Sequence, residues 1–338
     1  MRNKNILIII FILSALSCKN SSVKNVDVSG IKMETLHINR FEKDLFAIRT
    51  NDLLKQIPVL RKKYHPFFEL FCNNIVRIPA PNDSLLSINL KEFVKDVQIR
   101  EVEQDCISQY ASLSALEDEL TAAFQHYKYY FPNKPIPRIL SFISGFNYAI
   151  ISAESTLAIG LDMYLGEQYK MYASIGFPKY KIRKMRKEYL ATDCMKGWLE
   201  SEYELNPSKK DFLSQIIYNG KILYSLDALL PDAQDSLKIG YTAEQLQFCK
   251  NNETNLWAFF IEKNLLFSTK QSEYWKYISE GPSTNGLPKE TPAMIGNWVG
   301  WQIVRKYMSE NASVTLKQLM EENDAQKILA KSKYKPQK

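Results

Sequence analysis

The spacing of the three histidines is the first test for a metal-dependent enzyme. His37, His65 and His126 lie far apart in the chain. A zinc-binding H-E-x-x-H helix needs two histidines four residues apart, and none of the three has such a neighbour. The chain also has no G-x-S-x-G nucleophile motif, P-loop or G-x-G-x-x-G motif. We therefore interpret the histidines as surface or packed residues and expect no cofactor.

Carboxylates and thiols give no clearer catalytic pattern. Glu117, Asp118 and Glu119 have the spacing of a helix surface, and no signature supports a Cys–His nucleophile pair. Four cysteines follow the N-terminal region, widely separated and without a C-x-x-C motif: Cys72, Cys106, Cys194 and Cys249. In an oxidising compartment they could pair in three complete ways, but buried free thiols are the simpler interpretation.

The N-terminus has the three zones of a signal peptide. Arg2 and Lys4 precede eight apolar residues, 6–13, and small residues lead to Cys18. The apolar run is too short to cross a bilayer, which takes roughly 20 helical residues. We therefore predict that residues 1–17 are a lipoprotein signal peptide. Cys18 then becomes the lipidated, palmitate-bearing first residue of the mature protein.

Two details qualify this N-terminal prediction. Ala15 stands where the usual lipoprotein motif has Leu, and Leu16 follows it. The alternatives are ordinary secretion with Cys18 incidental, or an uncleaved anchor. Residues 18–30 are polar and aromatic-free, as in a flexible tether, and carry no acidic run after the cysteine. Such a run resembles a surface-export signal, so its absence favours a periplasm-facing protein, on either membrane.

The charge pattern excludes few partners but gives no support to nucleic-acid binding. Without residues 1–17 and their two cations, the formal charge falls from +7 to +5 and is spread along the chain. The densest basic cluster has apolar residues at helical spacing, typical of a solvated helix face or of a contact with anionic lipid or a partner. It comprises Lys179, Lys181, Arg183, Lys184, Arg186 and Lys187.

Hydrophobic spacing predicts the elements that would position these side chains. Residues 32–38 alternate like a strand, and helical spacing begins at Phe41. Pro58 should kink or split a helix that ends at Lys63. Further helices are expected between residues 66 and 131, before a proline-rich stretch.

The second half predicts a small sheet followed by helices. Three β-rich runs, 138–143, 146–151 and 156–161, favour an antiparallel meander. Helices are then expected at about 180–203, 208–230, 242–267, 271–279 and 291–310. The fold class is α+β, a mainly helical body with one small antiparallel sheet. Residues 31–325 are expected to form one domain and 326–338 a disordered tail.

A Gly/Pro-rich loop leading into a helix is the richest local signal. Thr291 is a plausible cap and Pro292 a first helical residue. Gly296 and Gly300, four residues apart, would allow another element to approach closely. Trp298 and Trp301 then either line a cleft for a partner or ligand, or fill tight helix packing.

Three blocks carry a family resemblance: Gly220 to Pro231, Asp235 to Thr242 and Ile295 to Arg305. They resemble the GldB family, the gliding-motility-associated lipoproteins of Bacteroidetes, and the resemblance covers nearly the whole mature chain. It implies a cell-envelope lipoprotein required for gliding. Its implied partners are the membrane, through the N-terminal lipid, and the gliding machinery linked to type IX secretion.

The chain is also similar, more weakly, to gluzincin-like zinc proteases. Placing Trp198 on the tryptophan that often follows the zinc helix motif lays residues 192–196 over H-E-x-x-H and Asn219 over the third ligand. Thr192, Lys196 and Asn219 would then replace all three zinc ligands, with Asp193 near the general base and residues 158–163 as the edge strand. The similarity implies a protease scaffold without its metal.

These observations predict a non-enzymatic structural or interaction component on a degenerate protease-like scaffold. The first alternative is a zinc-independent or unrecognised hydrolase or peptidase, which hydrolysis lost on changing Asp193 would support. The second is a lipoprotein that binds a peptide or glycan in a cleft between Pro282 and Trp301.

Overall fold

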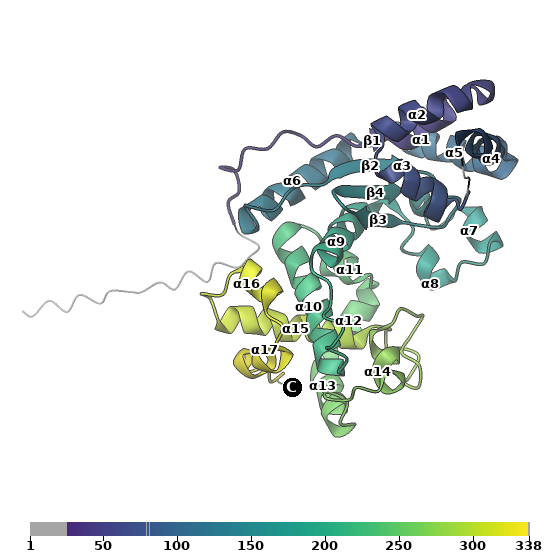
Figure 1. Cartoon of the computed structure of the whole chain (residues 1–338). Helices are drawn as coiled ribbons and strands as arrows, with labels where there is room; N and C mark the ends of the chain where they lie inside the picture. Colours follow the sequence, from purple (N-terminus) through teal and green to yellow (C-terminus); the bar gives the residue numbers. More distant parts are fainter. Residues whose placement is uncertain (1–25, 79, 81, 337–338) are drawn as a thin grey trace, which may run out of the picture.

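The computed structural model describes residues 26–78, 80 and 82–336 (Figure 1). The predicted signal peptide, Cys18 and the first part of the predicted tether lie outside these residues. Within the described ranges, no helix combines the length and the apolar character that a membrane crossing requires.

A four-stranded sheet lies in the upper half of the molecule, with strand order β1-β2-β4-β3 (Figure 1). The strands are β1 (Asn39–Arg40), β2 (Arg138–Phe142), β3 (Ile150–Ala153) and β4 (Thr156–Gly160). Only β3 and β4 pair antiparallel, whereas β2 pairs parallel with both β1 and β4. The α+β class is confirmed, but the antiparallel meander is wrong. Helices connect β1 to β2, and such a crossover places the two strands parallel.

The predicted strand at 32–38 is also wrong, because only Asn39 and Arg40 pair with the sheet. The backbone N–H groups of Leu36 and Ile38 instead donate to the side chains of Thr121, at 2.9 Å, and Glu117, at 2.8 Å. The alternating segment is therefore held by a helix surface.

Among the residues described before β2 there are six α-helices, and aromatic side chains pack them against the sheet. Phe41 contacts Phe71 edge-to-face at 4.8 Å between ring centroids, and Phe67 contacts Phe142 of β2 at 5.3 Å. The helices are α1 (Phe41–Phe46), α2 (Leu53–Lys63), α3 (Phe67–Leu70), α4 (Asp83–Lys95), α5 (Val97–Gln109) and α6 (Ser114–Tyr130), with short turns η2 (Thr50–Asp52) and η3 (Phe71–Ile75). Helix α2 continues through Pro58 rather than splitting there.

The predicted helix at 180–203 is interrupted. The chain forms η4 (Leu161–Tyr164), α7 (Lys170–Ser174), α8 (Lys179–Ile182), η5 (Lys187–Tyr189) and α9 (Leu190–Glu202). Between α8 and η5, Arg186 forms a β-bridge with Leu165, and the Gly166 N–H donates to the Met185 carbonyl at 2.9 Å. These tertiary backbone bonds replace the helical ones that a continuous helix would need.

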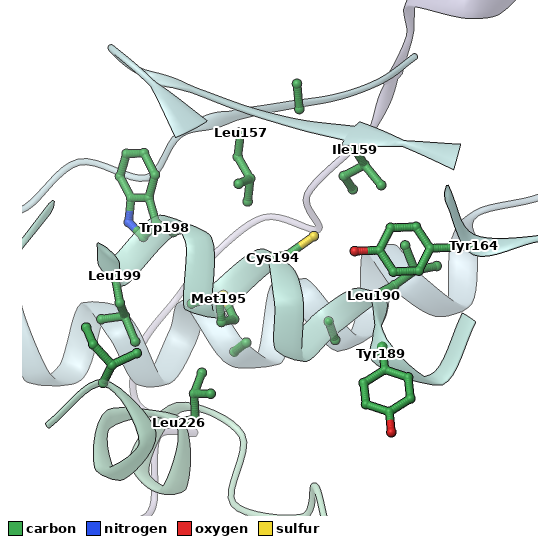
Figure 2. Close-up of a cluster of buried hydrophobic side chains, with 14 of the residues drawn as sticks. Leu157, Ile159, Tyr164, Tyr189, Leu190, Cys194, Met195, Trp198, Leu199 and Leu226 are labelled. Carbon is green, nitrogen blue, oxygen red and sulfur yellow. The ribbon is translucent and has the colours of Figure 1, made fainter. Parts of the chain in front are cut away.

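Helix α9 lies between the sheet and the lower helices. Figure 2 shows Leu157 and Ile159 pointing from the sheet onto α9, and Leu226 approaching from the opposite side. Cys194 and Trp198 fill the space beneath the strands, and both are buried. Since β3 is the edge strand and β4 lies inside the sheet, the expectation of an edge strand at 158–163 is wrong.

The lower half is helical (Figure 1). Its elements are α10 (Phe212–Leu229), α11 (Asp235–Ile239), α12 (Ala243–Asn251), α13 (Glu253–Glu262), α14 (Gln271–Ile278), α15 (Ile295–Glu310), α16 (Leu316–Glu321) and α17 (Ala325–Ser332). Helices α10 and α15 touch through glycines: a β-carbon on Gly220 would stand 2.8 Å from the Trp301 nitrogen, and one on Gly296 would stand 3.0 Å from the Cγ2 methyl of Ile216 in α10. The expected close approach at Gly296 and Gly300 is confirmed.

Two C-terminal expectations need correction. Residues 326–336 are not a disordered tail, because α17 buries Ile328 completely and the Tyr334 hydroxyl donates to Glu253 at 2.7 Å. The last long helix starts at Ile295 rather than near Thr291. The Thr284 backbone N–H donates to the Thr291 carbonyl at 2.9 Å, which closes a loop where the helix was expected.

Candidate functional site

A cavity of about 340 Å³ lies beside α9, between α8 and the end of α11. Its floor includes Asp193 and Lys196, which α9 presents on one face because they are three residues apart. Lys181 and Lys184 enter from α8 and the turn after it, and Glu280 enters from the loop after α14. We call this cavity the α9 pocket. It brings acidic, basic and apolar groups from distant segments together.

Asp193 is held at the pocket floor by Tyr164, the last residue of η4. The Tyr164 hydroxyl donates to the Asp193 carboxylate at 2.9 Å. Burial raises the pKa of Asp193, and the Tyr164 hydrogen bond and the charges of Lys196 and Lys184 oppose that rise only in part. The pair therefore gives the pocket a carboxyl group that holds its proton more tightly than a solvated aspartate.

Lysines outnumber carboxylates at the pocket wall. The Lys184 ammonium forms an ion pair with Glu280. Burial tends to raise the pKa of Glu280, but Lys184, Lys196 and Lys181 outweigh it, so the net shift is downward and the group is ionised at neutral pH. Lys196 also lies 4.0 Å from Glu200, one helical turn away on the half-exposed side of α9.

A buried carboxylate shapes the wall opposite α9. Asp162 accepts from the Ser144 N–H at 3.1 Å, the Ser144 hydroxyl at 3.0 Å and the Phe146 N–H at 2.6 Å. These bonds hold Phe146 at φ 65°, a conformation that costs a bulky residue free energy. The position of the Phe146 ring at the pocket thus depends on Asp162. The sequence pattern did not identify this residue.

The opposite rim has a second strained residue. Met294 immediately precedes α15 with φ 58° and lines the pocket. The Tyr241 hydroxyl donates to the carbonyl of Ala293, the residue before it, at 2.6 Å. Strained positions persist only where the surroundings over-determine them, and they cluster at binding and catalytic sites. Two of the six non-glycine residues with positive φ in the described chain, Phe146 and Met294, therefore line this pocket.

Of the four residues laid over a zinc site, the structure brings together two. Asp193 and Lys196 line the pocket, whereas the Thr192 hydroxyl is buried and donates to the Tyr189 carbonyl at 2.9 Å. The Asn219 side chain donates to the Gln215 carbonyl within α10 at 2.9 Å. An ammonium, a hydroxyl and an amide bonded in this way do not fit zinc, which takes imidazole, thiolate or carboxylate ligands. Among the residues that the structure describes, no group of three or more His, Cys, Asp or Glu could hold a metal.

Trp298 and Trp301 lie inside the packing of α15, as the helix-packing interpretation holds. Both are buried, and the Trp301 indole donates to Asp227 of α10 at 3.0 Å. Asp227 also receives Lys238 at 3.0 Å and two bonds from Arg305 at 2.8 Å. The Arg305 guanidinium stacks over the Trp301 ring at 3.8 Å from its centroid. The Trp301 indole is therefore part of a buried charge cluster between helices, and Trp298 is packed in the core.

The three histidines and the four cysteines in the described part of the chain do not line the α9 pocket. His37 and His65 are exposed, and His126 contacts the Ala122 carbonyl within its own helix. All four described cysteines are free and buried, which confirms the simpler of the two interpretations. Burial raises the pKa of Cys72 and of Cys249 to about 12, so neither is a thiolate at neutral pH.

Sequence reasoning missed most of the pocket. Lys181 and Lys184 belong to the basic cluster that the sequence singled out, but nothing in the spacing separates them from Lys179 and Lys187, which do not line it. Tyr164 and Glu280 carried no local signal. Only the fold places them beside α9.

Comparison with known proteins gives one finding. The family model described as gliding motility protein GldB matches residues 21–336, nearly the whole chain. No curated protein and no solved structure matches the chain.

Proposed function

Since this chain belongs to the gliding motility protein GldB family, we propose that it acts as a non-enzymatic binding component of the gliding machinery, on a scaffold that resembles a protease without its metal. The lipid at Cys18, including palmitate, anchors it to an envelope membrane, and the protein faces the periplasm. Its partners are other envelope proteins of the machinery.

The set of side chains around Asp193 is the observation that carries the proposal. Lysine ammonium groups and a tyrosine hydroxyl surround this carboxyl, where a metallopeptidase needs imidazole and carboxylate ligands. Lys196 places a positive charge in the position that the weaker resemblance assigns to a zinc ligand. The same groups suit recognition, because fixed charges beside an apolar wall orient a bound partner.

The test combines complementation of a deletion strain with biochemistry on the purified lipoprotein. We expect Asp193→Asn to restore gliding and to co-purify with the same envelope proteins as the wild type. Mass spectrometry of the wild type and of Lys196→Ala should find no stoichiometric metal in either. About one tightly bound zinc per wild-type chain would overturn the non-enzymatic proposal.

A second candidate, an unrecognised hydrolase, is favoured by the Tyr164–Asp193 pair. A carboxyl group with a raised pKa in a cavity is suited to general acid–base catalysis. Under this alternative, Asp193→Asn would abolish gliding while the fold and co-purification persist. That pattern would separate catalysis from binding, because the substitution keeps the shape of the side chain but removes the ionisable carboxyl group that proton transfer needs.

The two aromatic side chains that would have bound a peptide or glycan between Pro282 and Trp301 are not available to a ligand. Trp298 and Trp301 are packed inside the helices and present no ring face to a ligand. We therefore propose that the protein recognises its partner at the α9 pocket.

A further inference from the structure

The lining of the α9 pocket itself carries more lysines than carboxylates. Two carboxylates, Asp193 and Glu280, face three lysines, Lys181, Lys184 and Lys196. Glu280 is already paired with Lys184, and Asp193 accepts from Tyr164. Lys238 also lines the cavity, but its ammonium is bound to Asp227. Lys196 has Glu200 at 4.0 Å, but that pair is half-exposed and at the limit of an ion-pair distance. Lys181 and Lys196 are thus the cations best placed to meet a negative group from outside.

The rest of the wall is apolar and adaptable. Phe146, Phe177, Met163 and Met294 line the same cavity from four separate segments. Methionine side chains adjust to irregular apolar surfaces, and they are common where a site accepts side chains of different shape. A ligand that suits this cavity therefore carries an apolar body beside its negative group.

Backbone groups that pair with no other strand in the described part of the chain adjoin the pocket. Ala149 lines it, and β3 begins at the next residue as the edge of the sheet. Because the Gly160 N–H donates to the Ala149 carbonyl at 2.8 Å, the antiparallel register turns Ile151 toward β4 and leaves the N–H and C=O groups of Ile150 and Ser152 on the outer side. All four β3 residues are partly exposed. An extended chain can pair with such an edge.

We propose that the α9 pocket binds an extended acidic peptide segment of a partner protein. This inference rests on the binding role proposed above. One carboxylate of that segment lies between Lys181 and Lys196, its apolar neighbours fill the wall of Phe146, Phe177 and Met294, and its backbone pairs with the edge of β3. A phosphorylated lipid headgroup fits less well, since it has no backbone N–H and C=O groups to pair with the strand edge.

The experiment selects binders from a phage library of random nine-residue peptides on the full lipoprotein in detergent. We expect enriched peptides to carry Asp or Glu next to Leu, Ile, Phe or Met. For the strongest synthetic peptide, Lys181→Gln combined with Lys196→Gln should weaken binding about tenfold or more, because the peptide carboxylate loses both of its ammonium partners.

The matched control is Lys179→Gln combined with Lys187→Gln. It removes the same charge from the same basic cluster at positions that do not line the pocket, and it should leave peptide affinity within about twofold. All four lysines are at least partly exposed, so both double variants should unfold at the wild-type temperature.

Three results would overturn the peptide proposal. They are the absence of any enriched peptide, enrichment without acidic residues, and acidic enrichment that persists in the Lys181/Lys196 double variant. Displacement of the selected peptide by soluble dihexanoyl phosphatidylglycerol at lower concentration than by a second acidic peptide would also overturn it, in favour of a lipid. If the peptide selection fails while envelope proteins still co-purify, only this inference falls; if co-purification fails too, the proposed function falls with it.

Discussion

The backbone of Gly300 in α15 lies directly against the Ile216 carbonyl oxygen in α10, so that a β-carbon at position 300 would overlap that oxygen. Ile216 is completely buried, and its own β-carbon would be 3.1 Å from the added atom. Two helices of the lower half therefore meet through their main chains, and the contact has no flexible side chain that could move aside.

Gly300→Ala should destabilise the protein by about 3 kcal/mol, because α10 and α15 must separate to admit the methyl group. The helix-propensity gain of about 1 kcal/mol for alanine over glycine does not offset this cost. Guanidinium unfolding measures the effect. Gly197→Ala in α9 is the matched control, since its β-carbon would meet the Ile150 methyl at 2.9 Å rather than backbone. Equal losses at both positions would contradict the contact.

Asp227→Asn should cost about 3–5 kcal/mol of unfolding free energy. The substitution leaves the buried ammonium of Lys238 and the guanidinium of Arg305 without their common carboxylate. Asp235→Asn, which removes a more exposed partner of Arg305, should cost only about 1 kcal/mol. Thermal or denaturant unfolding of the two variants gives the comparison, and a larger loss for Asp235→Asn would show that the cluster is wrongly described.

The stability contribution of Asp162 should depend on pH. Burial raises the pKa of Asp162 to about 6, against the ordinary value of 3.8, although hydrogen bonds from Phe146 and Ser144 oppose the rise. The folded protein then binds this proton more tightly than the unfolded chain does. The stabilisation is complete below pH 3.8 and is lost as the pH rises through about 6.

The free energy of unfolding of the wild type and of Asp162→Asn, measured at several pH values between about 3.5 and 7, tests this linkage. The wild type should lose stability relative to the variant as the pH rises. A constant difference between the two proteins would mean that Asp162 does not titrate in this range.

Tyr164→Phe should raise the pKa of Asp193 further. Burial already raises that pKa, and the Tyr164 hydroxyl opposes the rise by donating to the ionised form. The side-chain carbon-13 shift of Asp193 reports the titration directly. Tyr189→Phe removes a hydroxyl that also lines the pocket but accepts from Arg183 instead, and it should leave the midpoint in place. A midpoint that moves equally in both variants would rule out the specific bond.

Thiol labelling should separate the buried cysteines from Cys18. In the native lipoprotein, a thiol reagent such as DTNB should react with none of the four buried cysteines, because burial keeps them protonated and out of contact with solvent. After unfolding in guanidinium, four of the five cysteines should react if the sulfur of Cys18 carries lipid. Five reactive thiols would contradict lipidation, and fewer than four would indicate a disulfide.

Local pattern alone predicted several parts of the molecule. Phe41 begins a helix because apolar residues follow at helical spacing, and the glycines at 296 and 300 do admit a neighbouring helix. The three blocks that resemble the GldB family also sufficed to identify it, since the family model matches residues 21–336. Such features depend on residues close together in the chain.

Tertiary contacts decided the rest. Residues 32–38 have strand alternation, but α6 supplied their hydrogen bonds, and a bridge between Leu165 and Arg186 broke a helix that periodicity favoured. The tail became helix α17 because α15 offers an apolar surface for Ile328. In the α9 pocket, Tyr164, Lys181 and Glu280 converge on Asp193 from segments up to more than 100 residues apart. Charge and burial act through space, so their combined effect on one carboxyl group follows only from the fold.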